Sequence, residues 1–278
     1  MRTYDDFVSS YVKLLESAKE IPLGEYRHLQ LPALPPNAPV AAIFSPHPDD
    51  EILSGAPLAL QLRREGYRIV NVAMTLGRPA QRVRRRAEVE AACAYIGFDL
   101  ELLSPDGFNS VSSSLRKRPE WVALVHAISQ FIDRVQPKAV IMHHTHDAHH
   151  DHQGTAYMVR DAFARSAWSG LLFEAEYWCD MYKPNLMLEV SASDLASMLE
   201  ALSFHKGELA RNPYHLRWPA LLSDNVRRSE IVLGRGATAP AFDFAVMYRR
   251  NVCEAGKIHP KAGRKQVISK TESIAFVL

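Results

Sequence analysis

Cysteine is scarce in this sequence. Its 278 residues include three cysteines, Cys93, Cys179 and Cys253, and no two of them are close together. An odd number of widely spaced cysteines is not a disulfide framework, and no Cys-x-x-Cys pair is present to bind a metal. We therefore expect a protein of a reducing compartment, the cytoplasm.

Long apolar runs, a surplus of charge and a glycine-rich loop are also lacking. No apolar run approaches the roughly 20 residues of a membrane-spanning helix, and residues 1–13 have no signal-peptide core. The formal net charge of +2 gives no reason to expect a nucleic-acid partner. The absence of a GxGxxG or Walker loop argues against nucleotide binding. We expect a small-molecule ligand and no membrane anchor, and a homo-oligomer is compatible with the sequence.

Strand-like and helix-like segments alternate over the first half of the chain. Short continuous apolar runs are typical of strands buried on both faces, and they predict strands at 40–44, 67–75, 100–103 and 137–142. Helical patterns predict the intervening helices at 51–64, 82–96 and 119–135. This alternation predicts an α/β fold: a Rossmann-like, doubly wound, mostly parallel sheet with helices on both faces. Ligand sites in such sheets lie at the carboxyl ends of the strands.

The pattern weakens after residue 170. Strands are predicted at 173–182 and 186–190 and a helix at 193–209, whereas 211–240 has no regular pattern. An amphipathic helix is predicted at 1–20.

Length and composition set the domain organisation that we expect. The chain has 278 residues, of which 47% are hydrophobic, and this is enough to bury a full core. We interpret residues 1–278 as a single domain. Its core is expected at about 38–190, and 191–278 is expected to be a helical or irregular extension of the same domain.

Two polar clusters follow predicted strands. The first is His47-Pro48-Asp49-Asp50-Glu51. Carboxylates also favour a helix N-terminus, but this does not explain a histidine at a strand end. The second cluster, residues 143–152, holds six of the 12 histidines. Imidazoles and carboxylates without a thiolate suit a catalytic zinc site, which keeps one position open for water. Ligand type alone would also admit Fe²⁺ or Mn²⁺.

At these residues the sequence resembles the LmbE/PIG-L family of N-acetylglucosamine deacetylases. That family carries an HPDDE-type motif after its first core strand, and residues 47–51 match it. It carries an HPDH-like motif after a later strand, which His149-His150-Asp151-His152 matches with His150 in place of proline. The resemblance covers about 38–155 well and continues weakly to about 250.

The resemblance implies a role for each motif residue. Asp49 would be the general base that acts on water, and His149 the electrophile or acid for the tetrahedral intermediate. Asp151 would orient or tune His149. The acid role stays open between His149 and His146, because the many histidines blur the register. Three residues would bind zinc: His47, Asp50 and His152.

Two further matches concern the substrate. Arg85 and Glu88 fit an Arg-x-x-Glu pattern of the family, which implies that Arg85 contacts sugar hydroxyls. Asp106 fits an Asp-Gly pattern and would hydrogen-bond the sugar. The structural alternatives are a surface arginine and a turn. His205 falls where the family has a histidine, although a core histidine is an equally good interpretation.

The sequence departs from the family pattern after the second predicted strand. The family often has Gly-Glu there, whereas this chain has Arg78-Pro79. Because that loop would border the site, substrate choice is expected to differ. The segment 207–230 could build a different acyl or aglycone pocket.

The resulting hypothesis is metal-dependent hydrolysis of the acetamide of an N-acetylated amino sugar or its conjugate, releasing acetate and a free amine. One alternative is hydrolysis of another N-acyl amide at the same zinc site. An alternative of another class is a non-catalytic, metal-binding Rossmann-like module, which would need neither Asp49 nor His149.

Overall fold

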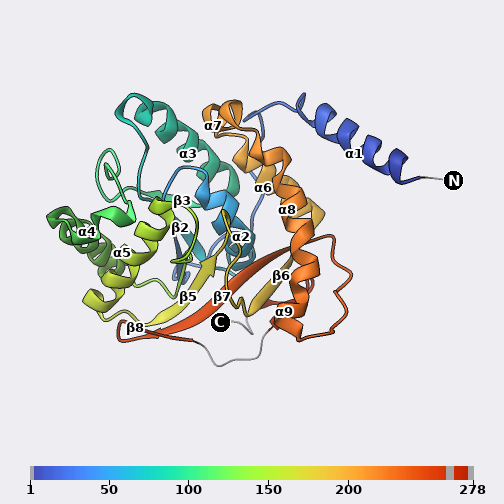
Figure 1. The fold of residues 1–278 in the computed structure, drawn as a ribbon. Coiled ribbons are helices and arrows are strands. Elements are labelled where there is room, and N and C mark those ends of the chain that lie inside the picture. Colours follow the sequence, from blue (N-terminus) through green and yellow to red (C-terminus); the bar gives the residue numbers. More distant parts are fainter. Residues whose placement is uncertain (1–2, 261–265, 275–278) are drawn as a thin grey trace.

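A mixed β-sheet forms the centre of the protein (Figure 1). The computed structural model describes residues 3–260 and 266–274. Within these ranges the sheet has nine strands in the order β3-β2-β1-β4-β5-β7-β6-β9, with β8 paired to β7. The strands are β1 (Val40–Ser45), β2 (Arg68–Ala73), β3 (Asp99–Glu101), β4 (Ala139–His143), β5 (Gly170–Ala175), β6 (Leu186–Val190), β7 (Phe244–Glu254), β8 (Lys257–Pro260) and β9 (Gln266–Ile268).

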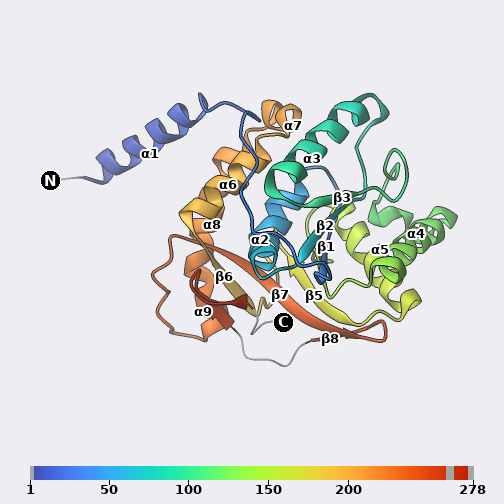
Figure 2. The same cartoon turned by 180° about the vertical axis from the view of Figure 1, so that it is seen from behind.

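Helices cover both faces of this sheet, and the predicted α/β fold is confirmed (Figure 2). Successive residues of β1 point to opposite faces. Ala41 and Ile43 pack in the core with α2, α3 and α6, whereas Ala42 and Phe44 pack in the core with α4 and α5. These helices are α2 (Ala56–Arg64), α3 (Arg82–Ile96), α4 (Pro119–Val135), α5 (His150–Ser166) and α6 (Ala192–Leu202).

Strand order reverses at β1. The chain runs from β1 through β2 to β3 on one side and then crosses to β4 and β5 on the other, with all neighbouring pairs parallel. Adjacent crossovers on opposite sides leave a crevice at the carboxyl ends of β1 and β4. Both polar clusters of the sequence begin at these two strand ends.

The C-terminal third differs from the prediction. Residues 211–240, predicted to be irregular, contain α8 (Trp218–Asn225) and α9 (Ser229–Leu233). The helix predicted at 193–209 is divided into α6 and α7 (Lys206–Arg211). Helices this short show little periodicity, so the pattern did not reveal them. The long strand β7 was not predicted either, and it joins the sheet antiparallel to both β5 and β6.

The predicted N-terminal helix is confirmed as α1 (Tyr4–Ala18). It begins at a Thr3 capping box, buries no residue and extends away from the body of the molecule (Figures 1 and 2). In the part of the chain that the structure describes, no helix is long and apolar enough to cross a membrane.

Candidate metal-binding and catalytic site

A cavity of about 860 Å³ lies where the two polar clusters meet. The first cluster follows β1 and continues into a π-helix, Glu51–Gly55, and the second follows β4 and opens α5. π-Helices are rare and often occur at functional sites. All six predicted metal-binding and catalytic residues line the cavity: His47, Asp49, Asp50, His149, Asp151 and His152.

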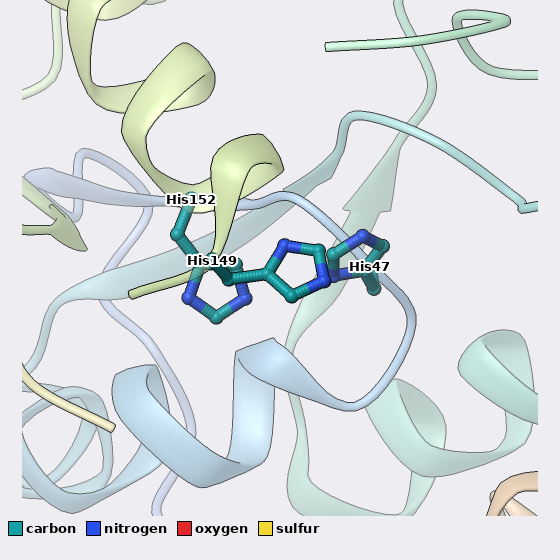
Figure 3. Close-up of side chains that lie close together, drawn as sticks. All are labelled: His47, His149 and His152. Atoms are coloured by element: carbon teal, nitrogen blue, oxygen red, sulfur yellow. The ribbon is translucent and has the colours of Figure 1, made fainter. Parts of the chain in front are cut away.

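The predicted metal ligands converge on the carboxylate of Asp50. Its Oδ2 lies 3.2 Å from His47 Nδ1 and 3.4 Å from His152 Nε2. Figure 3 shows the rings of His47, His149 and His152 side by side, and each offers a nitrogen within 4.8 Å of the other two. A second group of donors within 4.8 Å of one another consists of Asp50, His143 and His152. The sequence assigned no role to His143.

This donor set fits a metal ion. Nitrogen and carboxylate oxygen donors without a thiolate suit zinc and also Fe²⁺ or Mn²⁺. His152 Nδ1 lies 3.2 Å from Asp147 Oδ1, the carboxylate–histidine contact that commonly orients a metal-binding imidazole. Asp147 is fully buried and also accepts a hydrogen bond from the backbone N–H of His149 at 2.8 Å. His143 Nδ1 is buried without a hydrogen-bond partner.

In the metal-free site, protons occupy part of this donor set. Burial lowers the pKa of His47, but hydrogen bonds with Asp151 and Asp50 outweigh this effect and raise it to about 9. Burial and the neighbouring His152 lower the pKa of His143 to about 3, so that His143 is neutral. Since a metal binds deprotonated imidazole, metal binding at neutral pH releases a proton from His47.

Asp49 has a strained backbone. Its φ is 119°, in the left-handed region that residues other than glycine rarely adopt. Strain of this kind persists where surrounding contacts enforce it, and it clusters at active sites. Here the Asp49 N–H donates to Glu51 Oε2 at 2.8 Å, and Glu51 Oε1 lies 2.6 Å from His205 Nε2.

His205 therefore supports the site from within the core. Both His205 and Glu51 are fully buried, which agrees with the interpretation of His205 as a core histidine. Its contact to Glu51 nevertheless links α7 to the first motif.

The carboxylate of Asp49 accepts a short hydrogen bond from the Tyr214 hydroxyl. Burial and the charge of Asp50 raise the pKa of Asp49 to about 7, against the opposing effects of His205 and Tyr214. A carboxylate whose pKa lies near neutrality is suited to accept a proton from water.

The structure separates the two histidines between which the acid role was left open. His149 lines the cavity, and its ring centroid lies 4.9 Å from those of His47 and His152. His146 is exposed and is not among the lining residues. The position of His149 therefore favours it over His146 for contact with a bound substrate.

Asp151 contacts His149 through its backbone and His47 through its carboxylate. Its Oδ2 lies 3.0 Å from His47 Nε2, so its carboxylate contacts a predicted metal ligand and not His149. Only the Asp151 backbone N–H reaches His149, donating to Nδ1 at 3.2 Å because His149 caps α5. Burial and the neighbouring histidines lower the pKa of His149, so it is neutral at pH 7 with its proton on Nε2.

The two predicted substrate contacts have different outcomes. Arg85 lines the cavity and is 7% exposed. Asp106 is exposed and does not line the cavity, so the prediction that it contacts the substrate is not supported. The alternative of a turn describes it better, because Gly107 has a φ of 68° and its N–H donates to Ser104 O at 3.1 Å. Asn109, three residues further on, reaches the cavity instead.

Comparison with known proteins finds a family match over part of the chain. Residues 42–163 match the PIG-L family, described as GlcNAc-PI de-N-acetylase. The match includes both motifs, so the predicted LmbE/PIG-L resemblance is confirmed. No curated protein matches the chain.

Several solved structures share the fold of this chain. N,N'-diacetylchitobiose deacetylase from Pyrococcus horikoshii has a TM-score of 0.58 at 17% identity, covering 94% of this chain and 98% of that one. The A40926 pseudoaglycone deacetylase Dbv21 has a TM-score of 0.57 at 18% identity, with coverages of 81% and 99%. The 4-carboxy-2-hydroxymuconate hydratase GalB from Pseudomonas putida KT2440 has a TM-score of 0.58 at 17% identity, with coverages of 76% and 95%. Because the same fold carries deacetylases and a hydratase, the chemistry has to be argued from the site.

Part of the cavity lies outside the matched PIG-L segment. Tyr177 and Trp178 follow β5 and line one wall, and Trp178 is 56% exposed. The segment 208–214 contributes another wall, as the sequence suggested for 207–230. Single aromatic residues in loops carry no spacing signal, so Tyr177 and Trp178 were not identified as site residues from the sequence. Tyr214 lies in the segment 207–230, for which a pocket was suggested, but its contact with Asp49 was not predicted.

Proposed function

We propose that this protein is a zinc-dependent N-deacetylase that hydrolyses the acetamide of an N-acetylated amino sugar or its conjugate. The observation that carries the proposal is the convergence of His47, Asp50 and His152 beside Asp49 in one cavity. A non-catalytic metal-binding module has no need of Asp49 in a strained conformation at the cavity wall. The exposed Trp178 supports a sugar, because an aromatic face packs well on a pyranose ring.

His47, Asp50 and His152 would hold the metal. Bound there, zinc would supply a Lewis acid for the acetamide carbonyl and would acidify a water molecule. Asp49 accepts the proton of the attacking water at Oδ1, since Oδ2 accepts the Tyr214 hydroxyl. His149 donates from Nε2 to the oxygen that becomes negative when water adds to the carbonyl. The proton taken by Asp49 then passes to the amine that leaves, and acetate is released.

Acetate release tests this function. The panel consists of N-acetylglucosaminides, assayed with the protein as purified, after chelation and after zinc is restored. We expect release that chelation abolishes and zinc restores. If the protein binds one equivalent of zinc but releases acetate from no member of the panel, the proposed sugar deacetylase activity is contradicted. The two remaining hypotheses would then be hydrolysis of another N-acyl amide and a non-catalytic metal-binding module. If Fe²⁺ or Mn²⁺ restores acetate release and zinc does not, the metal in the proposal would change and the proposed reaction would stand.

Tyr214→Phe is expected to lower kcat about tenfold, because it removes one hydrogen bond to a charged group. Zinc content should stay at that of the wild type, since Tyr214 contacts Asp49 and none of the predicted ligands. Tyr177→Phe is the matched control: Tyr177 lines the same cavity, and within the described residues its hydroxyl makes no hydrogen bond to Asp49. Equal kcat values for the two variants would show that the Tyr214 hydroxyl does not act on Asp49.

A further inference from the structure

Three arginines line the same cavity as the motifs: Arg78, Arg85 and Arg211. Apart from the motif aspartates, Glu208 is the one carboxylate among the lining residues of the described chain. Glu208 lies 3.4 Å from Arg85 Nε and 2.7 Å from Arg211 Nη2. One carboxylate thus faces two of the three guanidinium groups, and this side of the cavity keeps a surplus of positive charge.

Arg85 is a buried cation with unused hydrogen-bonding capacity. It is 7% exposed, and its Nε has no hydrogen-bond partner despite the nearby Glu208. The loop after β2 lies against it: a Cβ on Gly77 would come within 2.5 Å of Arg85 Nη1. A buried cation that lines a cavity favours a ligand that supplies acceptors beside it.

Arg78 follows Gly77 directly and places a second guanidinium at the same cavity. It is exposed, and within the described residues its side chain has no ion pair and no hydrogen bond. Asn109 also faces this cavity, and its Oδ1 accepts a hydrogen bond from Arg82 Nη2 at 2.6 Å. That contact leaves the Asn109 NH₂ group free to donate. Arg78 in the loop after β2 and Asn109 therefore present donors and no carboxylate of their own.

We infer that the substrate carries an anionic group, a phosphate or a carboxylate, which binds to Arg78 and Arg85 while its acetamide lies at the metal-binding motifs. This inference rests on the proposed function. Guanidinium groups match phosphate and carboxylate oxygens with paired, charge-assisted hydrogen bonds. The anion would give Arg78 a partner and would place acceptors beside the Arg85 guanidinium.

The test compares three acetamides that differ in charge: methyl N-acetylglucosaminide, N-acetylglucosamine 1-phosphate and N-acetylmuramic acid, a carboxylate. We expect kcat/KM for one anionic probe to exceed that of the neutral glycoside about tenfold or more. The favoured probe identifies phosphate or carboxylate as the group recognised. The preference should shrink as NaCl is raised towards 1 M, since Arg78 is exposed and salt screens such contacts.

Variants assign the preference to Arg78. Arg78→Ala should bring the anionic-to-neutral ratio of kcat/KM close to one, Arg78→Glu should invert it, and Arg78→Lys should retain part of it. Arg86→Ala is the matched control, because Arg86 is also an exposed arginine but pairs with Glu90 at 2.9 Å and does not line this cavity. Equal kcat/KM for all three probes, or a preference that Arg78→Ala leaves intact, would overturn the inference while the deacetylase stands.

Failure of the proposed function is distinguishable from failure of the anion site. If the zinc-loaded protein hydrolyses no probe, the deacetylase proposal fails, and calorimetric titration with the same three compounds still tests the anion site. Tighter binding of an anionic probe, lost in Arg78→Ala, would support it. Equal binding of neutral and anionic probes by the wild type would overturn it.

Discussion

Asp49→Asn is expected to lower kcat by about 10²–10⁴-fold, the range that a positioned general base contributes. Asparagine has almost the same shape as aspartate and tolerates positive φ, so the backbone at φ 119° should be preserved. Its carbonyl oxygen can still accept the Tyr214 hydroxyl, but the amide cannot take a proton from water. Zinc content should remain at the wild-type value, because Asp49 contacts no predicted ligand through its side chain in the described residues.

The measurement pairs acetate release with metal analysis of the same sample. Asp106→Asn is the control, since Asp106 is exposed and outside the cavity, and its activity should equal that of the wild type. Full activity in Asp49→Asn would remove Asp49 from the mechanism. Lost activity in Asp106→Asn would restore the substrate contact that the sequence predicted and the geometry does not support.

Local sequence was sufficient to predict the site residues that lie close together in the chain. His47, Asp49 and Asp50 lie within four residues at the end of a buried strand, and the strand pattern placed them at the carboxyl edge of the sheet. His149 and His152 follow β4, which pairs directly with β1. Parallel neighbours bring their carboxyl ends together, so both clusters could be placed at one site before any contact was known.

Contacts between distant parts of the chain could not be predicted from local sequence patterns. The hydrogen bond from Tyr214 to Asp49 spans 165 residues, and the contact of His205 with Glu51 spans 154. Neither Tyr214 nor His205 lies in a periodic sequence pattern from which its contact could have been predicted. The short helices and the antiparallel strand β7 at 244–254 escaped detection for a related reason, because tertiary packing and not periodicity decides such elements.

Side-chain direction was the least predictable feature within the motifs. The family resemblance implied that Asp151 orients or tunes His149. His149 caps α5 and Asp151 lies in its first turn, so the Asp151 carboxylate instead reaches His47, from which it is separated by 104 residues. A motif thus identified the residues, whereas the helix start determined which of them touch.

Asp50→Asn, one residue from the first variant, is expected to have a different outcome: loss of both zinc and turnover. Asp50 is 3% exposed, and its carboxylate contacts both His47 and His152. Asparagine can keep the hydrogen bond from the His47 N–H, which is 2.9 Å long, but it brings no negative charge to the ion. Zinc affinity should fall by more than the roughly 10–100-fold that loss of an outer supporting group costs.

Titration of the apo-protein with zinc measures this affinity, and circular dichroism confirms that the variant is folded. Zinc bound with wild-type affinity by Asp50→Asn would show that histidines alone hold the ion, through the group formed by His47, His149 and His152. In that case His149 would be a ligand and not the donor to the substrate oxygen. Adjacent isosteric changes at Asp49 and Asp50 therefore separate proton transfer from metal binding at this site.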